Sequence, residues 1–216
     1  MSSSKSPLAL IVSSPSGAGK TTLTSRLLEL FPDLCFSVSH TTRKPRPNEE
    51  DGREYHFVSR QAFTGLVKRN EFLEWAEVHG NLYGTGRGEL RRAATARAIL
   101  FDIDHQGARQ IKAAVPDVVT VFILPPNPET LLLRLRGRAS EDEATVQRRF
   151  RTAREEIAHY GLFDYVLVND DLDEATEQLA SIFRAEECRR SRMAPKAEGL
   201  LAAERDFGVA SQSDDG

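Results

Sequence analysis

The sequence predicts a three-layer α/β domain with a parallel β-sheet at its centre. Short, continuous runs of apolar residues recur along the chain, and such runs are typical of parallel strands that are buried on both faces. Helical segments separate these runs, and this alternation favours a parallel sheet between two helical layers. The 216 residues suffice for one such domain with insertions, and 40% hydrophobic with 28% charged residues is a globular composition.

The apolar pattern assigns the strands and helices in chain order. The first apolar run ends at a Ser-Ser-Pro-Ser-Gly turn, and the helix after it carries Leu23, Leu27 and Leu30 on one face before Pro32 ends it. The predicted strands cover residues 8–13, 99–103, 118–124 and 165–168. The predicted helices cover residues 20–30, 106–114, 129–136, 141–159 and 172–188.

Two segments interrupt this alternation. Residues 37–90 are polar, aromatic and rich in turns, with alternating polarity over 54–58 and 72–78, which predicts an inserted small antiparallel or mixed β lobe. Residues 134–154 carry seven arginines against three acidic residues, which predicts a mobile helical lid. We expect one domain over residues 1–188, with the core in 1–36, 91–130 and 155–188, the lobe in 37–90 and the lid in 131–154. Residues 189–216 are predicted to be a loosely ordered tail, in which 200–203 favour a short helix.

Charge and cysteine content exclude several classes of protein. The 29 Lys and Arg against 32 Asp and Glu give a net charge of −3, which argues against a nucleic-acid binder but allows a local basic site for a small polyanion. Cys35 and Cys188 stand in no metal-binding or redox spacing, so we expect reduced thiols. No apolar run approaches the length of a membrane span, and the N-terminus lacks signal-peptide features. We therefore expect a cytoplasmic protein without a membrane partner.

The strongest single motif follows the first strand. Its residues match the phosphate-loop pattern GxxxxGK[ST], except that Ser14 stands where the pattern has its first glycine. Glycines let successive backbone N–H groups surround phosphate oxygens, Lys20 reaches the β- and γ-phosphates, and the Thr21 hydroxyl binds Mg²⁺. The alternative is a glycine-rich turn with an incidental lysine, and the motif alone does not specify the reaction. The predicted ATP-binding residues are Ser14, Pro15, Ser16, Gly17, Ala18, Gly19, Lys20, Thr21 and Thr22.

A second group of residues carries positive charge. Arg43 and Arg46 are three residues apart among prolines, which stiffen the backbone, and two guanidinium groups held close together suit a phosphate. Tyr55 and Tyr83 can donate hydroxyl hydrogen bonds to the same phosphate. A solvated basic loop and aromatic core packing are the alternative interpretations.

Eight segments together resemble the guanylate kinase family. They are SPSGAGKTT, SVSHTTRKPRP, DGREYHF, FLEWAEVHGNLYGTGR, FDIDHQGARQIK, VFILPP, RGRASEDEATVQRRF and DYVLVND, and they follow the family's order from about residue 8 to residue 187. The resemblance implies the phosphate-loop nucleotide-binding fold, with the lobe binding GMP and a helical lid, and we expect the lobe and the lid to close over the core.

The resemblance also implies roles for individual residues. It places guanine at Ser39, Glu74, Thr85 and Asp104, and the GMP phosphate at Arg43, Arg46, Tyr55 and Tyr83. It places transition-state arginines at Arg138 and Arg149, with help from Arg148, and an adenine contact at Asn169. Asp102 ends a strand beside the phosphate loop and is expected to hold Mg²⁺ through water. The chemistry agrees, since carboxylates accept from guanine N1–H and its 2-amino group, while Ser39 and Thr85 hydroxyls can donate to O6.

These implications predict a reaction. Mg-ATP and GMP, or dGMP, would give ADP and GDP by direct in-line transfer, with Lys20, Arg43, Arg138 and Arg149 as the catalytic residues. The alternatives are a non-catalytic guanylate-kinase-like interaction module and a kinase for another nucleoside monophosphate. We expect a purine-nucleotide enzyme that acts as a monomer or a homo-oligomer.

Overall fold

The structure is a computed structural model that describes residues 7–78, 80–137 and 142–203. Its contacts divide the chain into two compact units, with the boundary between Ala180 and Ser181, inside helix α7 (Leu172–Glu187). Each unit is described by itself.

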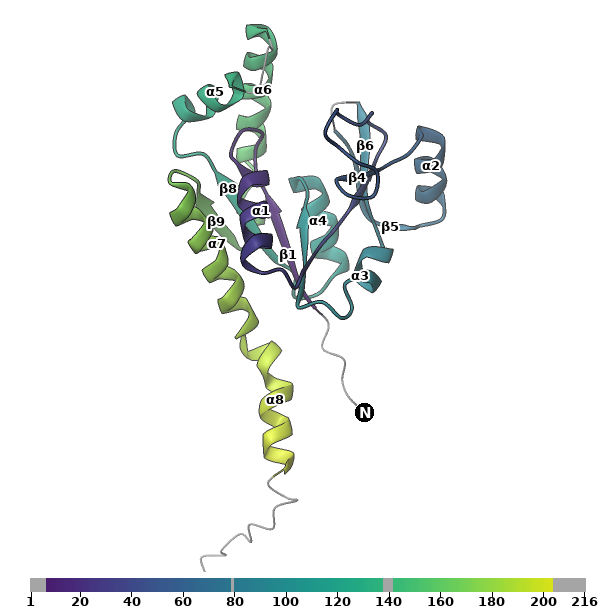
Figure 1. Ribbon diagram of the computed structural model, residues 1–216, viewed down its shortest axis with the longest axis vertical. Helices are drawn as coiled ribbons and strands as arrows, with labels where there is room; N and C mark the ends of the chain where they lie inside the picture. Colours follow the sequence, from purple (N-terminus) through teal and green to yellow (C-terminus); the bar gives the residue numbers. More distant parts are fainter. Residues whose placement is uncertain (1–6, 79, 138–141, 204–216) are drawn as a thin grey trace, which may run out of the picture. The chain divides into compact units, whose positions relative to one another are not determined.

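A parallel sheet of five strands forms the centre of the first unit (Figure 1). Its strands are β1 (Leu8–Ser13), β2 (Leu34–Phe36), β7 (Ala98–Asp102), β8 (Val119–Leu124) and β9 (Tyr165–Val168), in the order β2-β7-β1-β8-β9. All four neighbouring pairs are parallel, which confirms the predicted fold class. The sequence did not predict β2, because its three residues are too few to give an apolar run.

Helices cover both faces of this sheet. Ile11 of β1 and Phe101 of β7 pack in one buried cluster with Ile111 of α4 (His105–Ala114). Because side chains alternate along a strand, Leu10 and Val12 point to the opposite face, where α1 (Lys20–Leu30) contacts β1 and β7. The three layers are therefore a helix, the sheet and a helix, as predicted.

Two further helices pack side by side at the end of the sheet that carries the phosphate loop (Figure 1). They are α5 (Pro128–Arg136) and α6 (Glu143–Ile157), capped by the side chains of Asn127 and Asp142. Leu131 and Leu135 of α5 are buried with Val146 and Ala153 of α6. This pair corresponds to the predicted lid, and the 3₁₀ turn Tyr160–Leu162 leads from α6 towards β9.

The predicted lobe is a separate mixed sheet with two helices. Its strands are β3 (Ser39–Thr41), β4 (Tyr55–Phe57), β5 (Phe72–Val78) and β6 (Asn81–Gly86), in the order β4-β3-β6-β5. Strands β3 and β4 are parallel, whereas β6 is antiparallel to β3 and β5. The helices are α2 (Arg60–Lys68), which packs Phe63 against Phe72 and Leu82, and α3 (Gly88–Arg92).

A β-bulge in β5 decides which side chains face the core domain. Phe72 is opposite Gly86 and Glu74 is opposite Thr85, so two steps along β5 correspond to one step along β6. Such a bulge reverses the facing of the residues that follow it. Phe72 therefore packs beneath α2, whereas Glu74 turns towards the pocket described below.

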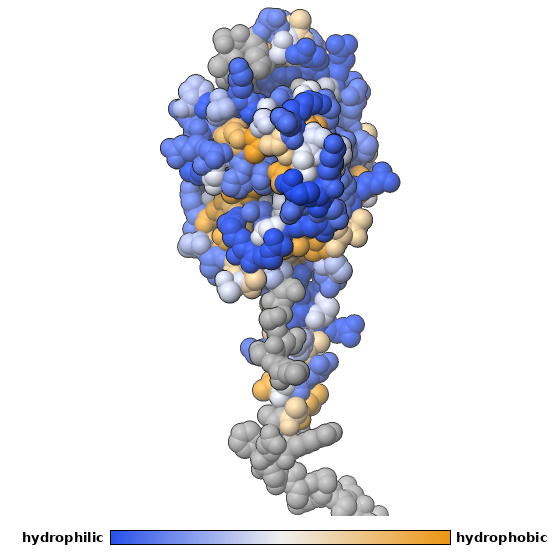
Figure 2. Space-filling model, turned by 90° about the vertical axis from the view of Figure 1, so that its right-hand side faces the viewer, coloured by the Kyte–Doolittle hydropathy of each residue, from blue (hydrophilic) through white to orange (hydrophobic). Residues whose placement is uncertain are grey.

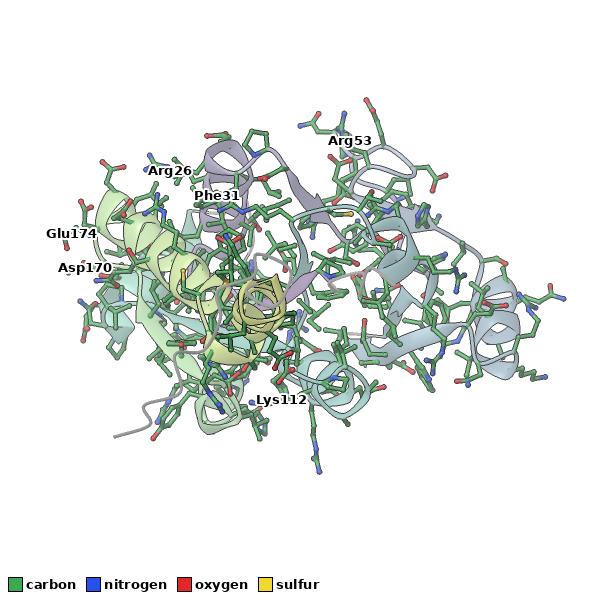
Figure 3. All side chains as sticks on the ribbon, turned by 90° about the horizontal axis from the view of Figure 1, so that it is seen from below. Arg26, Phe31, Arg53, Lys112, Asp170 and Glu174 are labelled. Atoms are coloured by element: carbon green, nitrogen blue, oxygen red, sulfur yellow. The ribbon has the colours of Figure 1, made fainter. Side chains whose placement is uncertain are left out.

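The surface seen from the side of the mixed sheet is mostly hydrophilic, with small separate hydrophobic patches (Figure 2). Ion pairs tie the outer helices to neighbouring segments: Lys112 of α4 pairs with Asp164, the residue before β9, at 2.6 Å, and Arg26 of α1 pairs with Asp173 of α7. Figure 3 labels Lys112 and Arg26 on these helices. None of the helices over the described ranges is long and apolar enough to cross a membrane.

The second unit contains the end of α7 and helix α8 (Arg190–Ala203). The expectation of a loosely ordered tail is wrong over these residues, because a helix of 14 residues replaces the predicted four. Its Arg, Met, Lys, Ala and Leu residues have high helix propensity, and this outweighs Pro195 and Gly199. Residues 204–216 lie outside the described part of the chain.

Candidate active site

The phosphate loop lies between β1 and α1 and depends on two glycines. Gly17 and Gly19 have φ of +90° and +93°, a conformation that side chains with a Cβ rarely adopt. A Cβ on Gly17 would lie 3.0 Å from Leu131, and one on Gly19 would collide with the Asn169 amide. Ser14 is not among the described residues with positive φ, so it replaces the first glycine of the pattern without backbone strain.

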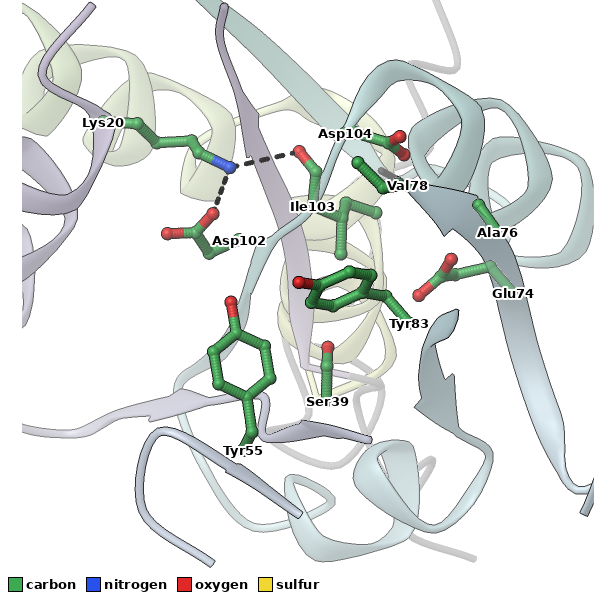
Figure 4. Close-up of a pocket in the computed structure, with 10 residues that line it drawn as sticks. All are labelled: Lys20, Ser39, Tyr55, Glu74, Ala76, Val78, Tyr83, Asp102, Ile103 and Asp104. Carbon is green, nitrogen blue, oxygen red and sulfur yellow. Dashed lines mark hydrogen bonds and ion pairs between the residues drawn. The ribbon is translucent and has the colours of Figure 1, made fainter. Parts of the chain in front are cut away.

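Lys20 extends from this loop into a pocket beneath the mixed sheet (Figure 4). Its ammonium group forms an ion pair with Asp102 and donates to the Ile103 carbonyl at 3.4 Å. Asp102 ends β7 and lies opposite Val12 in the neighbouring strand β1. The parallel sheet therefore places Asp102 beside the end of β1, from which the phosphate loop and Lys20 follow. Ser39, Tyr55, Glu74, Tyr83 and Asp104 line the same pocket.

Asn169 supports the phosphate loop from the end of β9. Its buried side-chain amide donates to the Ala18 carbonyl at 2.8 Å, and Arg134 donates to the Asn169 carbonyl at 3.1 Å. The predicted adenine contact of Asn169 stays a prediction. Arg134 also donates to the Ala18 carbonyl of this loop at 3.5 Å. This contact was not foreseen, because the residue resembled a solvated lid arginine in the sequence.

Helix α6 reaches the phosphate loop with two side chains. Arg149 donates to the Ser16 hydroxyl at 2.9 Å, and Glu156, two helical turns later, accepts from the Ser16 backbone N–H at 3.1 Å. The sequence predicted Arg149 but not Glu156, because one acid in a charged helix carries no distinctive signal. Arg148 is exposed, and Arg138 lies outside the described residues.

Three buried side chains form a hydrogen-bonded chain at the far end of the pocket. Thr85 donates to Glu74 Oε1 at 2.6 Å, and the Ser39 hydroxyl lies 3.1 Å from that of Thr85. Glu74 and Thr85 are directly opposite each other on β5 and β6, at 5% and 0% exposure. When Glu74 is ionised, Thr85 donates to it and Ser39 donates to Thr85, so three of the four predicted guanine contacts form one polar unit. In this arrangement the single hydroxyl protons of Thr85 and Ser39 are used within the chain and do not point to O6.

Burial raises the pKa of Glu74 to about 7; the Thr85 hydrogen bond opposes this rise and the nearby Asp104 adds to it. Asp104 accepts from the Gly107 N–H at 2.9 Å as the N-cap of α4, and its second oxygen accepts from Gln106 at 3.2 Å. The pocket therefore holds one carboxyl that ionises near neutrality and one that is fixed at a helix terminus.

Arg43 is held by an acidic residue that the sequence analysis missed. Both terminal nitrogens of Arg43 donate to Glu49 at 2.9 Å, and Glu49 also accepts from the Arg46 backbone N–H at 2.8 Å. The Arg43 guanidinium lies 5.4 Å from the Tyr55 ring centre, and burial raises the pKa of Tyr55 to about 12, which keeps its hydroxyl a donor. The Arg46 side chain is 73% exposed.

Most of the predicted binding residues therefore surround one region. A neighbouring cavity is lined by Thr21 and Asp102 together with Ser39, Arg46 and Tyr55. Both oxygen donors proposed for Mg²⁺ face this cavity, which fits an ion that takes few protein ligands and completes its shell with phosphate and water. No group of three or more His, Cys, Asp or Glu within the described ranges could hold a metal by itself.

Similarity to known proteins shows the family of this chain. The family model described as guanylate kinase matches residues 6–186. The chain belongs to the guanylate kinase family. A guanylate kinase of Aromatoleum aromaticum is 53% identical over 181 residues, which are 83% of this chain and 89% of that protein. One of Nitrosospira multiformis is 47% identical over 193 residues, covering 89% and 92%.

The fold agrees with a solved member of the family. The crystal structure of guanylate kinase from Anaplasma phagocytophilum has a TM-score of 0.71 and 35% identity, and the match covers 87% of this chain and 90% of that one. The family and the enzymatic function predicted from the sequence are thereby confirmed.

Proposed function

We propose that this guanylate kinase transfers the γ-phosphoryl group of Mg-ATP directly to GMP, and also to dGMP, and yields ADP and GDP. The observation that carries the proposal is the buried Ser39–Thr85–Glu74 chain, which lies in the same pocket as Lys20 of the phosphate loop. A guanine base and the reacting phosphates can then be held in one cavity, which makes the transfer effectively intramolecular.

Glu74 supplies the selectivity for guanine. An ionised Glu74 accepts from N1–H and the 2-amino group of guanine, whereas adenine presents an acceptor at N1. Its depth in the fold matters, because a buried carboxylate facing an acceptor loses its partner and cannot turn to water. Sites built in this way discriminate by about 10⁴–10⁵.

The transfer itself needs charge and alignment rather than a covalent intermediate. Arg43, Arg46, Tyr55 and Tyr83 hold the GMP phosphate, while Lys20 and backbone N–H groups of the phosphate loop hold the phosphates of ATP. When bound, Mg²⁺ at Thr21 and, through water, Asp102 neutralises charge on the β- and γ-phosphates. Arg149, already hydrogen-bonded to the phosphate loop, stabilises the charge that develops during transfer, together with Arg138.

Two alternative functions make different predictions. A non-catalytic interaction module would need neither the left-handed glycines nor the contact of Arg149 with Ser16, and both are present. A kinase for another monophosphate would not need a buried carboxylate with a hydroxyl partner at the base. The site therefore favours GMP as the acceptor.

A coupled assay of ADP release tests the proposal, with ATP, Mg²⁺ and a panel of GMP, dGMP, AMP, UMP and dTMP. We expect turnover with GMP and dGMP, little with the other three, and no turnover with the Lys20→Met variant. The Arg69→Met variant, exposed at the end of α2, is the matched control and should keep the wild-type rate. Absence of ADP release with GMP would refute the proposal, and equal rates with AMP would refute the assigned role of Glu74.

A further inference from the structure

The first turns of α4 contact β5 at the residue that reads the base. Glu74 lies on β5 of the mixed sheet, whereas α4 belongs to the core, so the two elements come from different parts of the chain. Two residues of α4, Gly107 and Gln110, are three positions apart and therefore lie on one helix face. This face is called the α4 seat.

Gly107 leaves the space that the Glu74 carboxylate occupies. A Cβ built on Gly107 would lie 2.7 Å from Oε2 and 3.1 Å from Cδ of Glu74. Gly107 lies inside a regular helix and is not among the described residues with positive φ, so alanine is compatible with its backbone. The clash would fall on the flexible end of Glu74, so the carboxylate would move while the helix stayed in place.

Gln110 fixes the backbone next to Glu74. Its side-chain amide donates to the Trp75 carbonyl at 2.9 Å and accepts from the Trp75 N–H at 3.3 Å. Strand β5 is at the edge of its sheet, so these groups of Trp75 have no strand partner on this side, and Gln110 takes the place of one.

We propose that the α4 seat is a specificity-determining element, in which Gly107 and Gln110 are positioning residues that hold the Glu74 carboxylate where it meets guanine. The inference rests on the proposed function, because it assigns the position of Glu74 in that same site. Thr85 holds Oε1 from one side, and the seat limits Oε2 from the other. Because Thr85 and Gly107 restrict the carboxylate on two sides, it can accept hydrogen bonds from a base in one direction only.

The Gly107→Ala variant tests the seat, with Gly65→Ala as the matched control. Gly65 is also helical and lies in α2 of the lobe that carries Glu74, and its Cβ would meet only the end of Arg69 at 3.3 Å. We expect Gly107→Ala to raise the KM for GMP at least tenfold, to leave the KM for ATP within twofold and to keep or raise the Tm, because alanine favours a helix over glycine. Gly65→Ala should leave both KM values unchanged.

A second pair of variants separates positioning from packing. Glu74→Asp shortens the side chain by one methylene and makes room for a Cβ, so Gly107→Ala should raise the KM for GMP less in the Glu74→Asp background than in the wild type. Gln110→Ala should raise the KM for GMP about fivefold and leave the KM for ATP within twofold. Variants whose KM for GMP stays within twofold of wild type, or effects that are fully additive, would overturn this inference alone. A wild-type chain that does not phosphorylate GMP would overturn the proposed function and the inference with it.

Discussion

Replacing Glu74 by glutamine changes the hydrogen-bonding pattern of the pocket while it keeps the shape of the side chain. The carboxylate is 5% exposed, and Thr85 is its hydrogen-bond donor at 2.6 Å. An amide offers one acceptor and one donor, so one guanine N–H would face an N–H group. Losing a hydrogen bond to a charged, buried partner costs about 2–3 kcal/mol, which corresponds to a fall of ~10² in kcat/KM for GMP. The KM for ATP should not change.

The same substitution should lower activity but raise the stability of the fold. The pKa of Glu74 is about 7 in the folded chain, against 4.5 as its ordinary value, so the folded state binds the extra proton between these two pH values. The stability from this group is complete below the lower value and is lost as the pH rises through the upper one. The difference corresponds to about 3 kcal/mol. Because glutamine cannot ionise, Glu74→Gln should be more stable than wild type by up to that amount at about pH 8.

Two measurements check this prediction. Urea unfolding between about pH 5 and 8.5 should give a free energy of unfolding that falls for wild type relative to Glu74→Gln. The coupled assay over the same range should give a kcat/KM for GMP that rises through about pH 7 only when Glu74 is present. The second ionisation of the GMP phosphate, near a pKa of about 6, affects both proteins, so their ratio isolates the carboxyl.

The control variant is Glu77→Gln, on the same strand but half-exposed and paired with Arg60. It should match wild type in both profiles. If the free energy of unfolding and the kcat/KM for GMP depend on pH in the same way in wild type and in Glu74→Gln, the reasoning is refuted, because Glu74 then does not ionise within the site.

Three further predictions follow from contacts around the site. Glu49→Gln should raise the KM for GMP about fivefold in steady-state kinetics, because Arg43 loses a bidentate ionic partner; a lower KM would mean that Glu49 competes with phosphate. Glu156→Ala should raise the KM for ATP about tenfold and leave that for GMP unchanged, because the Ser16 N–H loses a charged acceptor; equal effects on both would contradict this. Phe63→Ala should lower the free energy of unfolding by about 3–5 kcal/mol in urea, since this ring is fully buried; a loss below about 1 kcal/mol would contradict the packing.

The parts of the fold that the sequence predicted are those with a local pattern. The strands ending at Ser13, Asp102 and Leu124 are continuous apolar runs, and the phosphate loop is a fixed spacing of glycines and lysine. Strand β2 and helix α3 are too short to give a pattern. Helix α2 has Phe63, Leu66 and Val67 at helical spacing after the Ser59 cap, a signal that was present in the sequence but was overlooked. Helix α6 begins at Glu143, after its Asp142 cap, whereas the sequence analysis placed its start at residue 141. The capping signal was present in the sequence.

The site was predicted less completely, because its geometry depends on long-range contacts. Alternation along β5 would place Phe72 and Glu74 on one face, and only the bulge separates them. Glu49 and Glu156 look like solvated acids in sequence, because their partners Arg43 and Ser16 are recognised only once the loops are folded. Gly107 and Glu74 are brought together although they lie in different elements, β5 and α4, that are far apart in the sequence.

The paired charges of the site explain how a chain with a net charge of −3 can hold two polyanions. Lys20 and Arg43 are each held by a carboxylate, Asp102 and Glu49 respectively, so neither cation has to be ordered when substrate arrives. A nucleotide phosphate carries more charge than a carboxylate, so it can replace Asp102 as the partner of Lys20. That exchange would release the Asp102 side chain from Lys20, and Asp102 and Thr21 are the two oxygen donors proposed for Mg²⁺. Asp102→Asn should therefore raise the Mg²⁺ concentration needed for the half-maximal rate by a larger factor than it raises the KM for GMP. Equal factors for the two would exclude this exchange.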